Sequence, residues 1–341
     1  MAPAKFRTTA PLLLGLALAG CASSLAGAPP DPTVTPLATE TPSPTAAAPR
    51  PTSTPWATPP SPPALPTEPR PPATPTRPPA GAVTAFAFAD AEHGWVVRDA
   101  ALWATIDGGA SWSQRHVFPE PITRLDLVSR EIGWAAAGER AYQTLDGGAT
   151  WQPFAVPGWA ARLDFADPLH GWTPLQRTSD GGGTWTAARP CGDMAGRAVS
   201  FVSASEGWML CAGEPSAVNQ QRRLIHTTDG GGTWAAMHDG ATESPSIWTH
   251  GYSGDLFFLD GRRGWLWLGR ADLGRLHETE DGGATWRELD STSADLPTEF
   301  QFVSPTIGFG LSNPSRRDRH VTVLLATEDG GGSWRQIFPQ P

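Results

Sequence analysis

An eight-residue pattern occurs six times in this chain and constrains its fold more than any other feature. The pattern is Thr/Ser-x-Asp-Gly-Gly-x-Thr/Ser-Trp, called the octet below. Its copies span Thr105–Trp112, Thr144–Trp151, Thr178–Trp185, Thr227–Trp234, Thr279–Trp286 and Thr327–Trp334. Their aspartates are Asp107, Asp146, Asp180, Asp229, Asp281 and Asp329. Self-similarity at intervals of a few tens of residues is the signature of a repeat architecture.

A second pattern precedes every octet. A glycine is followed by an aromatic residue, which is Trp95, Trp134, Trp172, Trp208, Trp265 or Phe309. Seven and nine residues before each of these aromatic residues the chain is apolar, from Phe88 and Phe86 in the first unit to Phe302 and Phe300 in the last. Apolar residues at period two predict a buried strand. Each unit is therefore expected to form four antiparallel strands, A to D, which makes the chain an all-β propeller of six blades, with seven as the alternative.

The octet resembles the Asp box, the repeat of sialidase-type BNR proteins. The resemblance implies that each aspartate accepts hydrogen bonds within its own turn, while the two glycines adopt the positive φ of a tight hairpin. Six aspartates spread around a ring are then structural, and we expect no catalytic residue, metal or cofactor among them. His93 and His170 share one turn position, where the other units have unrelated residues, so we do not expect them to bind a metal.

The first 80 residues differ in composition from the remainder. Residues 1–20 carry Lys5 and Arg7 before a short apolar run, and Leu18-Ala19-Gly20-Cys21 resembles a bacterial lipobox. The resemblance implies cleavage before Cys21, lipidation of its thiol and an extracytoplasmic product anchored to the bacterial cell membrane, with the outer membrane as the alternative in a host that has one. A plain secretory signal with an incidental cysteine is the other interpretation. Residues 22–80 hold 20 of the 36 prolines, which predicts a disordered stalk. The stalk is a spacer, a ligand of proline-recognition domains or a site of O-glycosylation. The propeller is expected over 81–341.

Charge and cysteine content narrow the classes of function. The formal net charge is −9, and Lys5 is the only lysine, so binding to nucleic acid is not expected. The remaining cysteines, Cys191 and Cys211, are an even pair in an oxidising compartment, where a disulfide is plausible and free buried thiols are the alternative.

Function is sought where the repetition breaks. The segments between strands B and C are longer in units 4 to 6, and the segment between strands D and A is longest between units 4 and 5. In a propeller these loops share one face, opposite to the octets. Arginine with aromatic residues is typical of binding surfaces, although solvated loops would have the same composition. The candidate binding residues are Arg222, Arg223, Trp248, Tyr252, Arg270, Arg275, Arg316, Arg317 and Arg319.

The combined patterns look most like the photosystem II stability and assembly factor family, over 83–338. The resemblance implies a monomeric, non-enzymatic propeller that binds an envelope protein or a membrane-protein complex. That family has seven blades, whereas six units are found here, and the partner is therefore left open. A sialidase-like glycoside hydrolase or a carbohydrate-binding propeller is the alternative. It would require a tyrosine nucleophile and acidic partners, for which Tyr252, Glu243 and Asp255 are available. A sortilin-like peptide receptor would need a larger ring.

Overall fold

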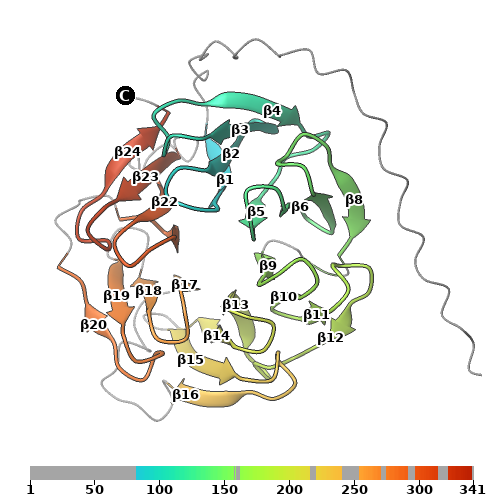
Figure 1. The fold of residues 1–341 in the computed structure, drawn as a ribbon. Helices are drawn as coiled ribbons and strands as arrows, with labels where there is room; N and C mark the ends of the chain where they lie inside the picture. Colours follow the sequence, from blue (N-terminus) through green and yellow to red (C-terminus); the bar gives the residue numbers. More distant parts are fainter. Residues whose placement is uncertain are drawn as a thin grey trace, which may run out of the picture. The chain divides into compact units, whose positions relative to one another are not determined.

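The described part of the chain forms a ring of six blades. The computed structural model describes residues 82–156, 158, 162–215, 220–239, 253–269, 274–290, 296–313 and 322–339. These residues form six four-stranded antiparallel sheets (Figure 1), which confirms the predicted six-bladed propeller. None of them forms a helix that could cross a membrane. The signal sequence, Cys21 and the stalk lie outside the described residues.

Blades 1 to 3 each contain four consecutive strands, which we name A to D from the centre of the ring outward. Blade 1 consists of β1 (Val83–Phe88), β2 (Gly94–Arg98), β3 (Ala101–Thr105) and β4 (Ser113–Val117). Blade 2 consists of β5 (Arg124–Leu127), β6 (Gly133–Ala137), β7 (Arg140–Thr144) and β8 (Gln152–Ala155). Blade 3 has the shortest strands, β9 (Asp164–Phe165), β10 (Gly171–Thr173), β11 (Gln176–Thr178) and β12 (Thr186–Ala187).

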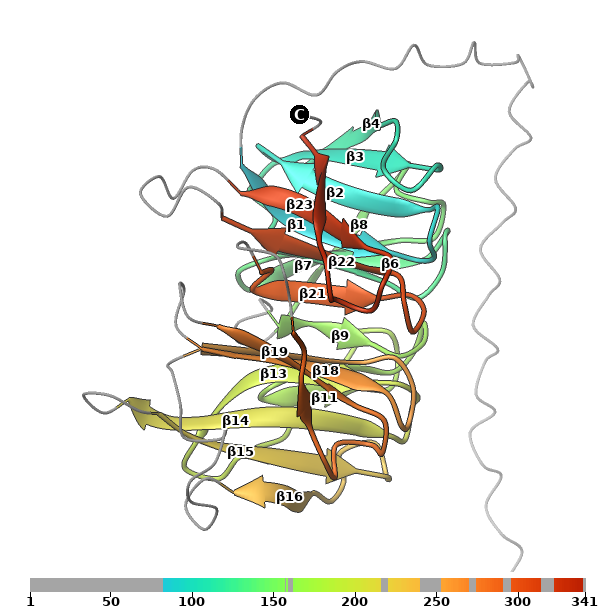
Figure 2. The same ribbon diagram turned by 90° about the vertical axis from the view of Figure 1, so that its left-hand side faces the viewer.

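Blades 4 to 6 repeat the same order. Blade 4 consists of β13 (Ala195–Phe201), β14 (Gly207–Pro215), β15 (Gln220–Thr227) and β16 (Ala235–Asp239). Blade 5 consists of β17 (Ser253–Phe258), β18 (Gly264–Gly269), β19 (Arg275–Thr279) and β20 (Arg287–Glu288). Blade 6 consists of β21 (Glu299–Phe302), β22 (Gly308–Ser312), β23 (Val323–Thr327) and β24 (Arg335–Phe338). The β14–β15 hairpin extends beyond the other blades on one side of the ring (Figure 2).

The octets form the C–D turns and share one face of the ring with the A–B turns. In all six blades the N–H of the first octet glycine donates to a carbonyl of the A–B turn, at 2.8 to 2.9 Å, as from Gly108 to Glu92. Within the octet the first threonine donates its hydroxyl to the aspartate, and the second threonine or serine donates both its N–H and its hydroxyl, as Thr279 and Thr285 do to Asp281. We call this side of the ring the octet face.

Aromatic stacking joins neighbouring blades. The ring of the Gly-Trp or Gly-Phe residue on strand B lies flat against the last phenylalanine of strand A in the next blade. Ring centroids are 3.4 to 3.8 Å apart, within 7° of parallel, in the pairs Trp134–Phe165, Trp172–Phe201, Trp208–Phe258, Trp265–Phe302 and Phe309–Phe88. Each of these phenylalanines also meets the edge of its own octet tryptophan, as in Phe258–Trp286. Such pairs contribute about 0.5–1.5 kcal/mol each beyond their buried area.

The ring closes without exchange of strands between the two ends of the described chain. Every sheet contains only the four strands of one unit. Blades 6 and 1 are joined by the Phe309–Phe88 stack, by a 2.9 Å hydrogen bond from the Phe88 N–H to Gln301 Oε1, and by a 3.3 Å bond from the Val83 N–H to the Thr322 carbonyl. Closure therefore uses the same kinds of contact as the other junctions.

Candidate functional site

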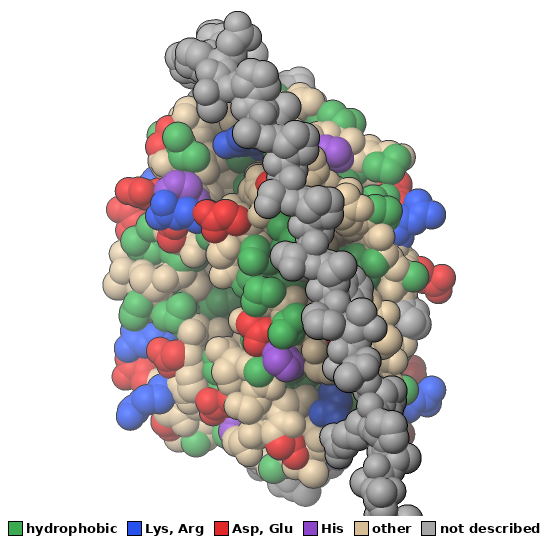
Figure 3. All heavy atoms as spheres, turned by 45° about the vertical axis from the view of Figure 1, so that its right-hand side comes forward, with side chains coloured by type: hydrophobic (Ala, Val, Ile, Leu, Met, Phe, Trp, Pro, Cys, Tyr) green, Lys and Arg blue, Asp and Glu red, His purple; other side chains and the backbone are tan. Residues whose placement is uncertain are grey.

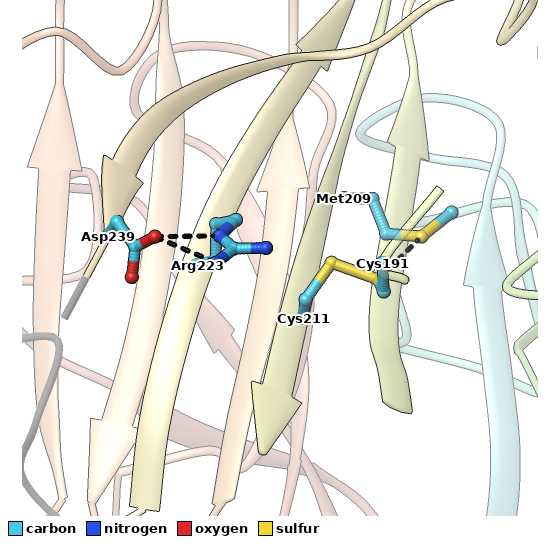
Figure 4. The surroundings of a disulfide bond; sticks show 5 residues. All are labelled: Cys191, Met209, Cys211, Arg223 and Asp239. Carbon is cyan, nitrogen blue, oxygen red and sulfur yellow. Dashed lines mark hydrogen bonds and ion pairs between the residues drawn. A yellow bond between two sulfur atoms is a disulfide. The ribbon is translucent and has the colours of Figure 1, made fainter. Parts of the chain in front are cut away.

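Three of the nine predicted binding-face residues lie in the described part of the chain. Arg275 is on the surface, and its Nε lies 2.8 Å from Glu288. Arg223 pairs with Asp239 at 2.8 Å (Figure 4). Arg222 does not belong to a binding face, because it is only 1% exposed. Burial, with the nearby charge of Arg197, lowers the Arg222 pKa to about 10. The alternation along a strand explains this correction: Arg222 and Arg223 point to opposite sides of β15.

The rest of the predicted face lies outside the described residues. Trp248, Tyr252, Arg270, Arg316, Arg317 and Arg319 all belong to segments that the structure does not describe. That surface remains a prediction from the sequence.

Cys191 and Cys211 form a disulfide in this structure, with Cα atoms 5.6 Å apart (Figure 4). The bond ties the connection that leads into blade 4 to strand β14, and both cysteines are buried. The Cys191 sulfur also lies 3.5 Å from the thioether of Met209. A bond that closes a loop of this length stabilises the fold by about 3 kcal/mol.

The octet aspartates are engaged in their own turns. Thr184 donates its N–H and hydroxyl to Asp180, and Thr178 donates its hydroxyl, which lowers the Asp180 pKa to about 2. The pKa of every other octet aspartate is lowered as well. A carboxylate held by this many donors is a poor general acid, so these groups shape the turns.

A charged cluster lies at the centre of the ring, and Asp255 is its only member that the sequence analysis had named. Its members come from the innermost strands or the residues just before them, in blades 2, 3, 5 and 6. We call it the central cluster, and it consists of Arg124, Asp126, Arg162, Asp164, Asp255 and Glu299. On β5, Arg124 and Asp126 alternate with the buried Leu125 and Leu127 and face the inner strand of blade 3.

The cluster carboxylates join one blade to the next. Asp126 accepts a hydrogen bond from the Phe165 N–H at 2.6 Å, and Asp164 accepts one from the Phe201 N–H at 2.8 Å. Ser200 and Gln301 occupy the same position of strand A and accept from the next blade in the same way. An ion pair of 3.2 Å between Arg162 and Asp255 crosses from blade 3 to blade 5. The short inner strand of blade 3 is thus held from both sides.

Burial shifts the proton affinities of the central cluster. Desolvation, with the charge of Asp126, raises the Asp164 pKa to about 8. Desolvation also raises the pKa of Asp126, and desolvation with the charge of Asp255 raises that of Glu299. The pKa of Arg124 is raised because the surrounding carboxylates outweigh its own desolvation. At neutral pH the central cluster therefore holds at least one proton on its carboxylates.

The space inside the central cluster is small. Arg124, Arg162, Asp164 and Asp255 line a pocket of about 10 Å³ together with apolar residues of β13, β17 and β21. A cavity of this size holds about one water molecule. Among the described residues no group of three or more His, Cys, Asp or Glu side chains is placed to bind a metal ion. The arrangement can hold protons and water, but it has no room for a sugar ring.

One signal in the sequence could have indicated the central cluster. Asp126 and Asp164 both lie eight residues before a Gly-Trp tryptophan, between two apolar strand positions. A charged residue at the same place in two buried inner strands needs a partner. Which partner it has, however, depends on the neighbouring blade.

Comparison with known proteins finds distant structural likenesses only. No protein-family model and no curated protein matches the chain. Among solved structures, YCF48 bound to a D1 peptide is 20% identical, with a TM-score of 0.46 over 75% of this chain and 82% of that protein. A GH74 enzyme of Niastella koreensis is 13% identical, with a TM-score of 0.47 over 74% of this chain and 46% of the enzyme. The α-L-arabinofuranosidase Arb93A of Fusarium graminearum is 11% identical, with a TM-score of 0.45 over 72% of this chain and 93% of the enzyme.

Proposed function

We propose that this chain is a non-catalytic protein-binding module, similar in role to photosystem assembly factors and anchored outside the cytoplasm by a lipid on Cys21. In this proposal the stalk holds the propeller away from the membrane, and an envelope protein or a membrane-protein complex binds to the propeller surface. The Arg-rich loops of blades 4 to 6 form one candidate surface. The octet face of blades 1 to 3 forms a second candidate surface, and its residues lie in the part of the chain that the structure describes.

Exposed aliphatic side chains on the octet face carry this proposal. Ile106 is 64% exposed and Leu145 is 65% exposed, and both occupy the second position of their octets. Leu169, in the A–B turn of blade 3, is 54% exposed. Blades 5 and 6 have Glu280 and Glu328 at the octet position of Ile106 and Leu145, so the turn itself does not require an apolar residue. A view onto the outer side of blades 2 and 3 shows hydrophobic side chains gathered between charged ones (Figure 3). Large aliphatic side chains exposed on one face of neighbouring blades are expected of a protein-binding surface.

The octet position also provides a test that leaves the fold intact. Ile106→Glu with Leu145→Glu introduces the residue that blades 5 and 6 already tolerate there. Ser179→Glu with Thr228→Glu is the matched control, since it adds the same charges at the same position of blades 3 and 4. In crosslinking on intact cells, with the captured proteins identified by mass spectrometry, the first pair is expected to lose a specific envelope partner that the control pair retains. Equal capture by both pairs would exclude the octet face. The Arg-rich loops of blades 4 to 6 are tested by a triple variant, Arg316→Ala with Arg317→Ala and Arg319→Ala. This variant is expected to capture less of the partner if those loops bind it.

A glycoside hydrolase is the second candidate function, and the raised pKa of Asp164 beside Asp126 is the observation that favours it. A protonated carboxyl next to a second carboxyl can serve as a general acid. The pocket of about 10 Å³ argues against a substrate at this place. We expect no turnover of sialosides or xyloglucan by the wild-type chain. Measurable hydrolysis that is lost in Asp164→Asn or in Tyr252→Phe would establish catalysis instead.

A further inference from the structure

The junction between blades 1 and 2 lacks the aromatic stack that joins the other five pairs of blades. At this junction Trp95 of β2 meets Leu127 of β5, where every other inner strand ends in phenylalanine. Trp95 instead packs edge-on against the octet tryptophan Trp151, with centroids 5.7 Å apart. We call a junction between two blades a seam. The seam between blades 1 and 2 therefore has an indole, that of Trp95, whose usual stacking partner is missing.

A pocket opens on the octet face at this seam. It has a volume of about 230 Å³, an apolar base that includes Trp95, Ala104 and Leu127, and a rim that includes Ile106 and Arg115. A cavity of about 150 Å³ is large enough for benzene. The seam pocket can therefore accept an aromatic side chain that reaches the indole of Trp95.

Most charged groups around the seam pocket have hydrogen-bond or ion-pair partners within the protein. Asp90 accepts both Arg130, at 2.7 Å, and His93, at 2.9 Å. Glu131 accepts the Ser129 hydroxyl at 3.0 Å, and Asp146 is held in its octet by Thr144 and Thr150. Arg115, on β4, is exposed and has no ion pair with any described residue. Arg115 is thus available to a ligand beside the apolar base, on a lining that also carries the Glu131 and Asp146 carboxylates.

We propose that the seam pocket binds a peptide segment of a protein partner through an aromatic side chain with a carboxylate next to it. The aromatic ring would enter the seam pocket next to Leu127 and contact the indole of Trp95, and the carboxylate would pair with Arg115. Stacking against an indole and a charge-assisted hydrogen bond are both stronger when partly shielded from water. This inference rests on the proposed protein-binding function and names the element that the octet face recognises.

The test uses the full chain in detergent and fluorescein-labelled hexapeptides. The probe is Gly-Ser-Phe-Asp-Ser-Gly, and its analogues carry Ala in place of Phe or Asn in place of Asp. We expect fluorescence anisotropy to show binding of the probe at least tenfold stronger than of either analogue. Leu127→Phe is expected to weaken probe binding at least tenfold while keeping or raising the thermal midpoint, because it supplies the missing ring from within the protein. Arg335→Ala, on the outer strand of blade 6, is the matched surface control and should bind the probe normally.

A second variant keeps the inference testable if Leu127→Phe does not fold. Arg115→Ala is expected to weaken binding of the probe about tenfold but to leave binding of the Asn analogue unchanged, since the two changes remove the same interaction. Absence of probe binding, or binding that neither variant changes, would overturn the inference. Those results would leave the protein-binding proposal to be decided by the capture experiment with Ile106→Glu and Leu145→Glu. If Leu127→Phe still captures the partner normally, the seam-pocket inference is refuted while the protein-binding proposal stands.

Discussion

Replacement of Asp164 by asparagine should change how the stability of the propeller depends on pH. The Asp164 pKa is raised from 3.8 to about 8, chiefly because the carboxyl is desolvated and secondly because Asp126 is near. The folded protein therefore retains a proton that the unfolded chain releases above pH 4. Since the native state binds more protons, the contribution of this carboxyl to the free energy of unfolding is fully present below about pH 4 and is lost as pH rises to about 8.

The magnitude follows from the size of the shift. Each pKa unit corresponds to about 1.4 kcal/mol, so a shift of roughly four units sets an upper limit of about 5 to 6 kcal/mol on the loss between pH 4 and pH 8. The loss belongs to the coupled Asp126–Asp164 pair rather than to one residue. Asparagine keeps an oxygen that can accept from the Phe201 N–H, and it carries no charge at any pH. Asp164→Asn should therefore flatten the curve and exceed the wild-type stability at pH 9.

Urea unfolding at pH 5, 7 and 9 measures this directly, with tryptophan fluorescence as the signal and the disulfide kept oxidised. Asp260→Asn is a suitable control, because Asp260 lies in the exposed A–B turn of blade 5, outside the central cluster. Wild type and Asp164→Asn curves that stay parallel from pH 5 to pH 9 would show that the Asp164 carboxyl is not desolvated as the structure indicates. The reasoning about the central cluster would then be wrong.

Two further predictions concern buried groups away from the central cluster. Arg98 is buried, none of its three guanidinium nitrogens has a hydrogen-bond partner, and desolvation lowers its pKa. Arg98→Met should raise the free energy of unfolding by about 1–3 kcal/mol in urea titrations, whereas the exposed Arg115→Met should change it little. The nearest opposite charge is the exposed Asp99 carboxylate, 3.7 Å from Arg98 Nε. A less stable Arg98→Met would mean that this ion pair outweighs the cost of burying the guanidinium. Cys191→Ala with Cys211→Ala should lower the free energy of unfolding by about 3 kcal/mol. Reducing agent should lower the stability of the wild type and leave that of the variant unchanged, and a wild type that loses no stability on reduction would contradict this prediction.

Much of the fold could be predicted because its determinants are local. The octet bonds between Thr279, Asp281 and Thr285 join residues at most six positions apart, so any chain with this pattern can form the turn before the ring exists. The apolar alternation at Phe300 and Phe302 marks a buried strand for the same reason. Six copies of both signals predicted six blades, and the structure has six.

The candidate sites could not be predicted to the same extent, because their contacts join different blades. Asp126 meets Phe165 across 39 positions of sequence, and Arg162 meets Asp255 across 93. Arg222 was predicted to lie on the surface because it belongs to an arginine-rich segment, but the alternation of side chains along β15 buries it. The substitution of Leu127 for phenylalanine is visible in the sequence, but only the packing of β5 against β2 shows that a pocket opens beside it.

The sequence by itself determined the all-β class, the six units, the octet turns and the positions of the aromatic residues, since each rests on contacts within one unit. Only the tertiary structure decided what lies between units. It paired every strand-B aromatic with the next blade, brought the carboxyls of four inner strands to the centre of the ring, and left one seam without a stacked ring. Desolvation and stacking depend on which groups surround a side chain, and closure of the ring brings those groups together from distant parts of the chain.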